Sequence, residues 1–252
     1  MHTGSIPVVA FHVRYGVAIV FRASARYYDA IYGFKDYEGE AAAIDQRIQR
    51  ARPGASTLLD VACGTGGHLR HLRERYACQG LDLAEEQLAI VRERLPDVPV
   101  HLADMTSFDL GRTFDAVVCL FSSIGYSGTL ERLHAAIATM AAHLNPGGVL
   151  IVEPWLEPDA WQDGHLSFLA VDEDDIKVAR MARSETEGRL AVMAFEHLVL
   201  THVHGVEHFV ERHELALFTV AEYLEAFAAA GLDAAHDPEG LVGRGLYTAV
   251  RV

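Results

Sequence analysis

The stretch Leu58-Leu59-Asp60-Val61-Ala62-Cys63-Gly64-Thr65-Gly66-Gly67-His68 decides the fold of this chain. A compact apolar run ends near an acid and is followed by glycines, which predicts a strand, a tight turn and the start of a helix. Glycines at such a turn let a ligand approach the backbone closely. The dinucleotide pattern G-x-G-x-x-G fails here, because Leu69 occupies the third glycine position.

Asp60 separates the two classes of cofactor that bind at turns of this kind. A dinucleotide carries a pyrophosphate, which helix N–H groups attract and a nearby carboxylate repels. S-adenosylmethionine (SAM) carries an ammonium and a sulfonium, which a carboxylate attracts. An acid at the end of the strand therefore favours SAM.

Two further acids follow the next two predicted strands. Asp82 ends the second strand, where a carboxylate can accept hydrogen bonds from both ribose hydroxyls. Asp104 and Met105 follow the third strand, placed to accept from the adenine amino group and to flank the ring. Each acid also has a plain structural interpretation, because carboxylates near strand ends form turns and cap helices. Three acids in this order on consecutive strands favour the SAM interpretation.

From residue 57 the chain alternates short apolar runs with amphipathic stretches. The predicted strands are 57–61, 78–83, 98–102, 114–120 and 149–152. The predicted helices are 68–76, 85–95 and 130–144, the last with apolar residues Leu130, Leu133, Ile137, Met140 and Leu144 and ended by Pro146-Gly147-Gly148. Strands that alternate with helices indicate βαβ units. We therefore expect an α/β, Rossmann-like fold with a mostly parallel sheet flanked by helices.

The pattern changes over 165–218, where apolar residues alternate and glycines fall at turn positions. This predicts an antiparallel β insertion. Thr219 and Glu222 then form a capping box, which opens a helix through Phe227 that Gly231 ends. A last strand near 246–250 closes the sheet.

Composition excludes some classes of partner. Half of the 252 residues are apolar, which predicts a well-filled core. The formal charge of −14 repels a phosphate backbone, and no basic stripe is present, so we expect no nucleic-acid partner. The three cysteines, Cys63, Cys78 and Cys119, show no C-x-x-C spacing and are expected to be reduced, buried thiols.

The N-terminal residues 6–25 are rather apolar but contain Arg14 and Arg22. A signal peptide places its charge before an unbroken apolar run, and a membrane span needs about 18 or more uncharged residues. We expect an extra strand or a poorly ordered extension, no membrane association and a cytoplasmic protein.

Histidines crowd the predicted insertion, at His197, His202, His204, His208 and His213. His202 and His204 would share a strand face, as zinc ligands can. No acid or cysteine shows matching spacing, so we expect packing roles and no metal site. The inserted strands are a candidate surface for a homodimer.

Longer motifs give the chain a family resemblance. LLDVACGTG, GLDL, ADM and NPGGV are similar to the successive motifs of class I SAM-dependent methyltransferases. The strings YDAIY (28–32), KDY (35–37), FSSIGY (121–126), EPW (153–155) and GRGL (243–246) resemble the N,N-dimethyltransferases of nucleotide-linked 3-amino-deoxysugars, of the desosamine and mycaminose type found in macrolide antibiotics. The resemblance starts near Tyr27, which leaves 1–26 as an extension of unknown role before a methyltransferase domain of 27–252.

The resemblance implies SAM-dependent methylation, once or twice, of the amine of a dTDP-linked aminodeoxysugar in antibiotic or glycoside biosynthesis. It places at the cofactor Tyr32, Tyr37, Asp60, Ala62, Gly64, Gly66, Asp82, Leu83, Asp104, Met105 and Leu120. It places at the substrate Ser123, Tyr126, Glu153, Trp155 and Arg244. It also puts Tyr126 and Tyr32 beside the reacting amine as catalytic residues.

Chemistry limits what these residues can do. Methyl transfer is an in-line displacement, so alignment of the reacting atoms is the main task and contributes about 7–11 kcal/mol in favourable cases. A phenol is a poor base at pH 7, so Tyr126 is expected to orient the amine rather than to deprotonate it. Arg244 can bind a diphosphate through its guanidinium fork, although an arginine between glycines also fits a surface loop.

Two departures from the family pattern concern the substrate more than the reaction. The family usually reads G-R-G-K-D-Y where this chain has Gly33-Phe34-Lys35-Asp36-Tyr37, so an arginine expected near the cofactor carboxylate is missing. Lys35 offers a point charge there and no bidentate fork. Leu156 stands where a second tryptophan is frequent.

Two rival functions stay open at this point. A methyltransferase acting on another small-molecule amine, hydroxyl or carboxylate would have the same cofactor half. A non-catalytic SAM-binding partner subunit would bind the cofactor without turnover, but its cofactor motif is usually degraded. The sequence does not fix the sugar, the position of the amine at C3 or C4, or the number of methyl groups.

Overall fold

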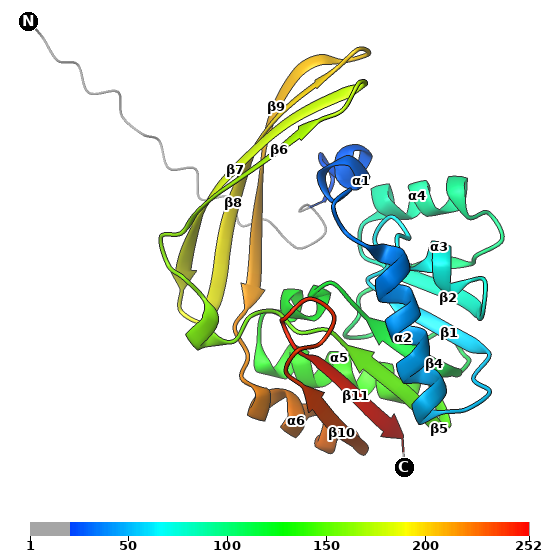
Figure 1. Ribbon diagram of the computed structural model, residues 1–252. Helices are drawn as coiled ribbons and strands as arrows, with labels where there is room; N and C mark the ends of the chain where they lie inside the picture. The colour runs from blue at the N-terminus through cyan, green and yellow to red at the C-terminus, as the bar shows by residue number, and fades with distance from the viewer. Residues whose placement is uncertain (1–20, 252) are drawn as a thin grey trace, which may run out of the picture.

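The protein, represented by a computed structural model that describes residues 21–251, contains two separate β-sheets (Figure 1). The strands of sheet A are β1 (Thr57–Val61), β2 (Ala77–Asp82), β3 (Val100–Leu102), β4 (Phe114–Cys119), β5 (Leu144–Val152), β10 (Leu232–Asp237) and β11 (Leu246–Arg251). The strands of sheet B are β6 (Leu166–Asp172), β7 (Ile176–Glu187), β8 (Leu190–Thr201) and β9 (Gly205–Ala216).

Sheet A has the order β10-β11-β5-β4-β1-β2-β3. The pairs from β5 to β3 are parallel, and β11 joins β5 antiparallel. From β1 the chain adds β2 and β3 on one side of the sheet and then returns to add β4 on the other side of β1. The carboxyl ends of β1 and β4 therefore border a crevice of the kind where α/β proteins bind ligands. The expected α/β, Rossmann-like fold with an antiparallel insertion is confirmed.

Helices cover both faces of sheet A. They are α2 (Tyr37–Ala51), α3 (Leu69–Leu72), α4 (Glu85–Arg94), α5 (Leu130–Ala142) and α6 (Val220–Ala229). The short helix α1 (Tyr28–Ile31) packs with sheet B instead, and the 3₁₀ turns are η2 (Ala25–Tyr27), η3 (Ser123–Ser127) and η4 (Pro158–Ala160). Helices α5 and α6 pack on one face, while α2, α3 and α4 pack on the other. The Thr219–Glu222 capping box that opens α6 is confirmed.

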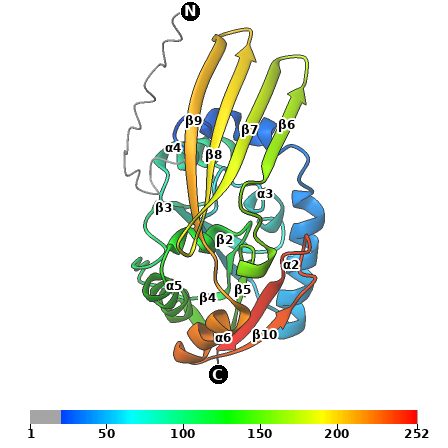
Figure 2. The same ribbon diagram turned by 90° about the vertical axis from the view of Figure 1, so that its left-hand side faces the viewer.

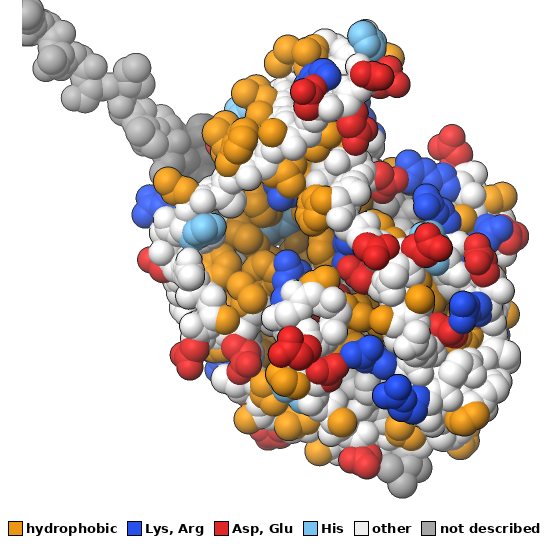
Figure 3. Space-filling model, viewed as in Figure 1, with side chains coloured by type: hydrophobic (Ala, Val, Ile, Leu, Met, Phe, Trp, Pro, Cys, Tyr) orange, Lys and Arg blue, Asp and Glu red, His pale blue; other side chains and the backbone are white. Residues whose placement is uncertain are grey.

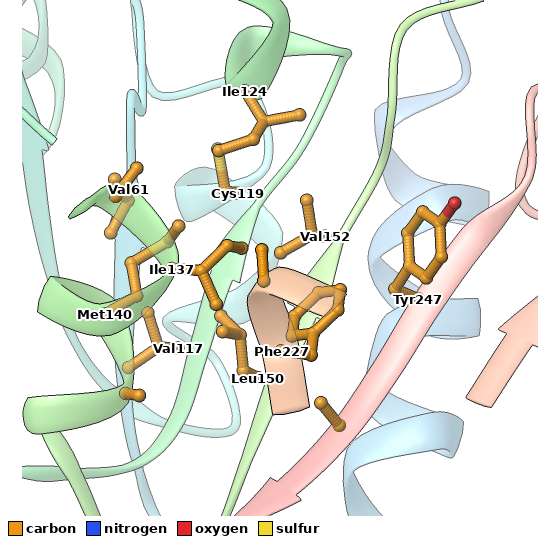
Figure 4. Packing of buried hydrophobic residues seen from close by; sticks show 14 of the residues in the cluster. Val61, Val117, Cys119, Ile124, Ile137, Met140, Leu150, Val152, Phe227 and Tyr247 are labelled. Carbon is orange, nitrogen blue, oxygen red and sulfur yellow. The ribbon is translucent and has the colours of Figure 1, made fainter. Parts of the chain in front are cut away.

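The alternation of side chains along the strands builds the two cores. Val117 and Cys119 of β4 point to the α5 and α6 side, while the alternate residues Ala116 and Val118 point to the other. Every residue of β4 is buried, and all of them are apolar except Asp115, which pairs with Arg52. Figure 4 shows the first of these clusters, in which Phe227 of α6 packs against the strands.

Two sequence predictions about helices are wrong. Helix α5 ends at Ala142, and Leu144 lies in β5 instead of the helix. Strand β5 continues through the segment 146–148, where the register against β4 shifts and Gly147 adopts a φ of 68°. The predicted helix 68–76 is a single turn, α3, because the chain must enter β2 at Ala77. Helix α2 and strand β10 were not predicted.

Sheet B stands beside sheet A as a separate layer that arches over α1 (Figures 1 and 2). Its inner face packs Val178 and Val199 against Tyr27 and Ile31. The expected boundary between residues 26 and 27 stays a prediction, and most of the N-terminal extension lies outside the described residues. Its described end contacts sheet B, where the backbone N–H of Ser24 donates to a Glu211 carboxylate oxygen at 3.0 Å.

The described residues, 21–251, bear on the expectations about membrane helices and cysteines. No helix in this part of the chain is long and apolar enough to cross a membrane. The expectation that Cys63, Cys78 and Cys119 are buried free thiols is confirmed.

Candidate active site

Two adjoining cavities lie at the carboxyl ends of β1, β2 and β4. Both are lined by Tyr28, Ala62, Gly64 and Ser123. One also contains the predicted cofactor residues Asp82, Leu83, Asp104 and Met105 together with Tyr126. The other contains Tyr37, Asp60 and Leu120. The structure thus brings most of the predicted cofactor residues together around one continuous crevice.

Two predicted cofactor residues lie at its margin. Gly66 lines a neighbouring cavity, where its φ of 83° favours glycine and a side chain would crowd Val91 and Leu95 at 3.3 Å. Tyr32 lies between the crevice and sheet B, in edge contact with the Phe121 ring.

Asp60 holds a buried carboxylate without a complete set of partners. The residue is 2% exposed, and its Oδ2 has no hydrogen-bond partner among residues 21–251. Burial, and next the charge of Asp82, raise its pKa to about 8. An unpaired carboxylate in a buried cavity is stabilised by a cation. The ammonium of SAM carries such a charge, so the buried carboxylate of Asp60 fits the cofactor.

Asp82 is fixed by the turn that follows β1. Its Oδ2 accepts from the Gly64 N–H at 2.8 Å and its Oδ1 from the Ala84 N–H at 2.9 Å. These bonds orient the carboxylate and leave a free lone pair on each oxygen, as recognition of two ribose hydroxyls requires. Burial raises its pKa, although the backbone hydrogen bonds oppose this.

Asp104 has a structural role as well as its predicted one. Its Oδ1 accepts from the N–H and hydroxyl of Thr106, at 2.9 and 2.8 Å, and its Oδ2 accepts from Arg132 at 3.0 Å. Burial opposes ionisation, but these donors outweigh it and lower the pKa. Asp104 is therefore the turn former that its position also indicated, and its contact with adenine stays a prediction.

Gln87 of α4 is a cofactor-site candidate that sequence reasoning missed. It is 2% exposed, lines the same cavity as Asp82, and its amide Nε2 has no partner among the described residues. A buried unpaired donor beside Gly64 fits an acceptor atom of a ligand. Gln87 stands in ordinary helix-forming sequence in the first half of α4, so no local pattern marks it as a ligand-binding residue.

The loop after β4, which contains Phe121 and Ser122, has an unusual backbone conformation. Phe121 and Ser122 have φ values of 52° and 61°, a left-handed conformation that is uncommon for residues other than glycine. Strain of this kind clusters at binding sites. Two hydrogen bonds fix this loop conformation. Oε2 of Glu153 accepts from the Phe121 N–H at 2.6 Å, and the Ser122 hydroxyl donates to the Pro154 carbonyl at 2.7 Å.

Glu153 also presents an unsatisfied buried atom. The residue is fully buried, and its Oε1 has no partner within residues 21–251. Burial raises its pKa, while Lys35 and Arg244 lower it less strongly. Trp155 similarly has a buried Nε1–H without a described partner. Both predicted substrate residues therefore hold a buried polar atom without a described partner, and their contact with substrate stays a prediction.

Arg244 reaches this loop from the turn before β11. Its guanidinium lies 5.2 Å from the Trp155 ring and 5.9 Å from the Phe121 ring, and it donates to the Ser122 hydroxyl at 3.3 Å. It makes no ion pair with a carboxylate among the described residues. Two aromatic faces thus hold a cation whose fork remains open to an anion.

Lys35 is already paired within the protein. Its ammonium contacts both Glu40 oxygens, at 2.5 and 2.6 Å, and His68 contacts the same carboxylate at 2.8 Å. Lys35 also lies 4.2 Å over the Phe121 ring. Because Glu40 compensates its charge, Lys35 is a weak replacement for the arginine that the family pattern places near the cofactor carboxylate.

Arg180 of β7 was also missed by sequence reasoning. It donates to the Tyr32 hydroxyl at 3.1 Å, and its guanidinium lies 4.6 Å from the Phe195 ring. Burial raises the pKa of Tyr32, and Arg180 opposes that change. The basic residue comes from sheet B, far from the cofactor motifs in sequence, so only the fold brings it to the site.

Tyr126 of η3 contacts sheet B as well. Its hydroxyl lies 2.6 Å from Nδ1 of His213 in β9. Burial raises the pKa of Tyr126 well above its usual value of 10.0, so the phenol stays protonated at pH 7. The expected orienting role agrees with this, because a phenol of such high pKa does not supply a base.

The histidines of sheet B do not gather around one point. Among residues 21–251 no group of three or more His, Cys, Asp or Glu side chains is arranged to hold a metal ion. His197 stacks on Phe209, and His208 pairs with Glu196 at 2.6 Å.

Comparison with known proteins identifies the family. A methyltransferase-domain family matches residues 58–148. The chain is 46% identical to a dTDP-3-amino-3,4,6-trideoxy-alpha-D-glucopyranose N,N-dimethyltransferase of Streptomyces venezuelae, over 86% of this chain and 92% of that one. It is 38% identical to a dTDP-4-amino-2,3,4,6-tetradeoxy-D-glucose N,N-dimethyltransferase of Saccharopolyspora spinosa, over 89% and 91%.

Solved structures agree with these relatives. The crystal structure of Streptomyces venezuelae DesVI matches with a TM-score of 0.87 at 45% identity, over 90% of this chain and 98% of that one. SAM-bound CalS10, an amino pentose methyltransferase from Micromonospora echinaspora involved in calicheamicin biosynthesis, matches with a TM-score of 0.82 at 44% identity, over 92% and 98%. The chain therefore belongs to the SAM-dependent sugar N,N-dimethyltransferases, within the class I methyltransferases.

Proposed function

We propose that this enzyme methylates the amino group of a dTDP-linked aminodeoxysugar in antibiotic or glycoside biosynthesis. The observation that carries the proposal is Arg244, an arginine without a carboxylate partner among residues 21–251, held between two aromatic rings beside a crevice that fits SAM. The family relatives named above act on dTDP-linked amino sugars, which supports the same substrate class.

The residues divide the work of the reaction. When bound, SAM supplies an activated methyl group: the amine lone pair forms the new N–C bond, the S–C electron pair stays on sulfur, and the ammonium product releases a proton to solvent. Asp60, Asp82 and Gln87 would hold the cofactor, and Tyr126 and Tyr32 would orient the amine. The protein's contribution is alignment and exclusion of water.

A cavity of about 540 Å³ next to Arg244 is a fitting place for the nucleotide. It is lined by Lys35 and Phe121 as well as by the loop 240–242. Figure 3 shows the hollow between the two sheets, where hydrophobic and basic side chains meet. Arg244 is the positive charge at this cavity that can pair with an anionic substrate, because Lys35 is already paired with Glu40, which lines the cavity together with Asp36.

The test is a mass-spectrometric assay with purified enzyme, SAM and dTDP-linked 3-amino and 4-amino sugars. A gain of one or two methyl masses supports the proposal, and comparison of the two sugars assigns the position of the amine. No gain on either, with SAM binding measured separately, would favour a methyltransferase of another small molecule. The family membership argues against a non-catalytic subunit.

The proposal extends to a homodimer formed through sheet B. Its outer face, seen in Figure 2, exposes apolar side chains that share one side of the strands, among them Phe168, Met181, Leu198 and Val210. Phe168 and Met181 are direct cross-strand neighbours. The paired Glu196 and His208 lie among these side chains, and exposed apolar residues around such a polar pair fit an interaction surface. The three free thiols are consistent with the expected cytoplasmic location.

Light scattering after size exclusion tests the dimer. Phe168→Glu places a charge on the face and is expected to shift the mass to the monomer. Val203→Glu, on the exposed hairpin between β8 and β9, adds the same charge outside the face and is the matched control. A monomeric wild type, or an unchanged mass for Phe168→Glu, would contradict the proposal.

A further inference from the structure

His213 connects Tyr126 to the inner face of sheet B. It is 4% exposed and lies in edge contact with the rings of Phe195 and Phe21, at 4.8 and 5.2 Å between centroids. Its Nδ1 is 2.6 Å from the Tyr126 hydroxyl, and its Nε2 is 3.9 Å from Oε2 of Glu211. Aromatic packing explains the position of the ring but not the short polar contact on one side of it.

The surroundings of the ring determine its protonation state. Burial, and to a smaller extent the nearby His197 and Arg180, lower the pKa of His213 to about 3. At neutral pH the imidazole is therefore uncharged, with one N–H and one acceptor nitrogen. Glu211 lies next to Nε2 and offers only oxygen atoms, one of which already accepts from Ser24. The Glu211 oxygen lies 3.9 Å from Nε2, beyond hydrogen-bond distance, but its electrostatic attraction for an N–H favours the tautomer with the proton on Nε2 and Nδ1 as the acceptor.

The polarity of the Tyr126 contact follows. Nδ1 without a proton can only accept, so the Tyr126 hydroxyl donates to it. A phenol oxygen has one proton and two lone pairs. Once the proton points to His213, only lone pairs remain for the side of the phenol that faces the cavity shared with Asp82 and Ser123.

We propose that His213 is a positioning residue that fixes the direction of the Tyr126 hydroxyl, so that Tyr126 accepts a hydrogen bond from the substrate amine and never donates to it. A hydroxyl that donated to the amine would occupy the nitrogen lone pair that must attack the methyl group. Acceptance of an N–H instead leaves the lone pair free and directs it. This inference rests on the proposed function.

His213 is not the proton acceptor of the reaction in this account. A neutral imidazole whose pKa is about 3 takes up a proton poorly at pH 7. The phenol of Tyr126, whose pKa is raised, does not ionise there either. The pair acts through geometry, and the proton leaves the product amine to solvent.

Nitrogen-15 NMR of the full chain, labelled at histidine and free of substrate, tests the tautomer without any assay of activity. The expected spectrum at pH 7 shows a neutral His213 with a protonated Nε2 and an unprotonated Nδ1. The Tyr126→Phe variant should change the Nδ1 resonance and leave that of His197 in place. A protonated Nδ1, or an imidazolium, would overturn the proposal.

A double-mutant cycle on the active enzyme tests the consequence. His213→Leu removes the acceptor, and we expect kcat to fall about tenfold or more while KM for SAM stays within about twofold, because orientation alone is lost. In the Tyr126→Phe background, which has no hydroxyl to misdirect, His213→Leu should cost nothing further. His213→Asn, which can return an oxygen acceptor near the Nδ1 position, should recover part of kcat.

The control is His197→Leu, which removes another buried histidine of sheet B that stacks on Phe209. It should change thermal stability without lowering kcat. An equal loss of kcat from His213→Leu with and without the Tyr126 hydroxyl would show that His213 only packs the sheet. If the wild type is inactive on every amino sugar while the tautomer is as expected, the proposed function fails and the geometry stands.

Discussion

Binding of SAM should release a proton from Asp60. Its carboxyl is buried with an unpaired Oδ2, and its pKa of about 8 means that about nine tenths of it is protonated at pH 7 in the free enzyme. An opposite charge at contact distance typically lowers a pKa by about 1–3, to about 5–7 here. The arithmetic gives a release of about 0.4–0.9 proton at pH 7.

The same values set the energetic effect of Asp60→Asn. The fall in the pKa of Asp60 on binding stabilises the SAM complex by about 0.4–2.7 kcal/mol at pH 7. Asp60→Asn loses this contribution and should bind SAM about 2- to 100-fold more weakly. Calorimetry in two buffers of different ionisation enthalpy measures the proton count. The difference between wild type and variant isolates Asp60 from the ligand's own ammonium, which titrates in both.

Asp97→Asn serves as the control, because Asp97 pairs with Arg73 on the surface and should leave both quantities unchanged. An equal proton count for wild type and Asp60→Asn would refute the assignment of Asp60 to the ammonium. The sign of the stability effect provides a second check. A carboxyl whose folded pKa is raised loses stability as pH rises between the unfolded value of 3.8 and about 8, so ligand-free Asp60→Asn should be less sensitive to pH in that window.

Three further predictions concern separate parts of the molecule. Asp82→Ala strips the ribose partner and should weaken SAM binding by about 1–3 kcal/mol in calorimetry, and unchanged affinity would exclude this assignment. Arg244→Ala should raise KM for the nucleotide sugar far more than KM for SAM in steady-state kinetics, and equal effects would make Arg244 structural. Thr219→Ala breaks the capping box with Glu222 and should lower the free energy of unfolding by about 1 kcal/mol in denaturant titrations, with kcat retained; no change would mean that the cap is not limiting for α6.

The parts of the site that could be predicted lie on one local motif. The strand, turn and helix around Asp60 and Gly64 impose their geometry within a few residues, and Asp82 follows because parallel strands end at the same edge. Helix α2 carried a usable signal as well. Asp36 accepts from the Gly39 N–H at its start and acids fill its first turn, a pattern typical of helix N-termini that was overlooked.

The rest depends on contacts that no local pattern encodes. Tyr126 and His213 are 87 residues apart, and Arg180 reaches Tyr32 across 148 residues. Alternation in sheet B predicts strands but not which face meets the cofactor domain. Leu144 was misplaced because an apolar residue at helical spacing looks the same whether the helix continues or a strand begins.

The central claim is methylation of a dTDP-linked amino sugar. The most direct measurement is the mass of the sugar nucleotide after incubation with the purified enzyme and SAM. The account predicts a gain of one or two methyl groups that Arg244→Ala reduces through KM. An unchanged mass for both the 3-amino and the 4-amino sugar, with enzyme that binds SAM, would contradict it.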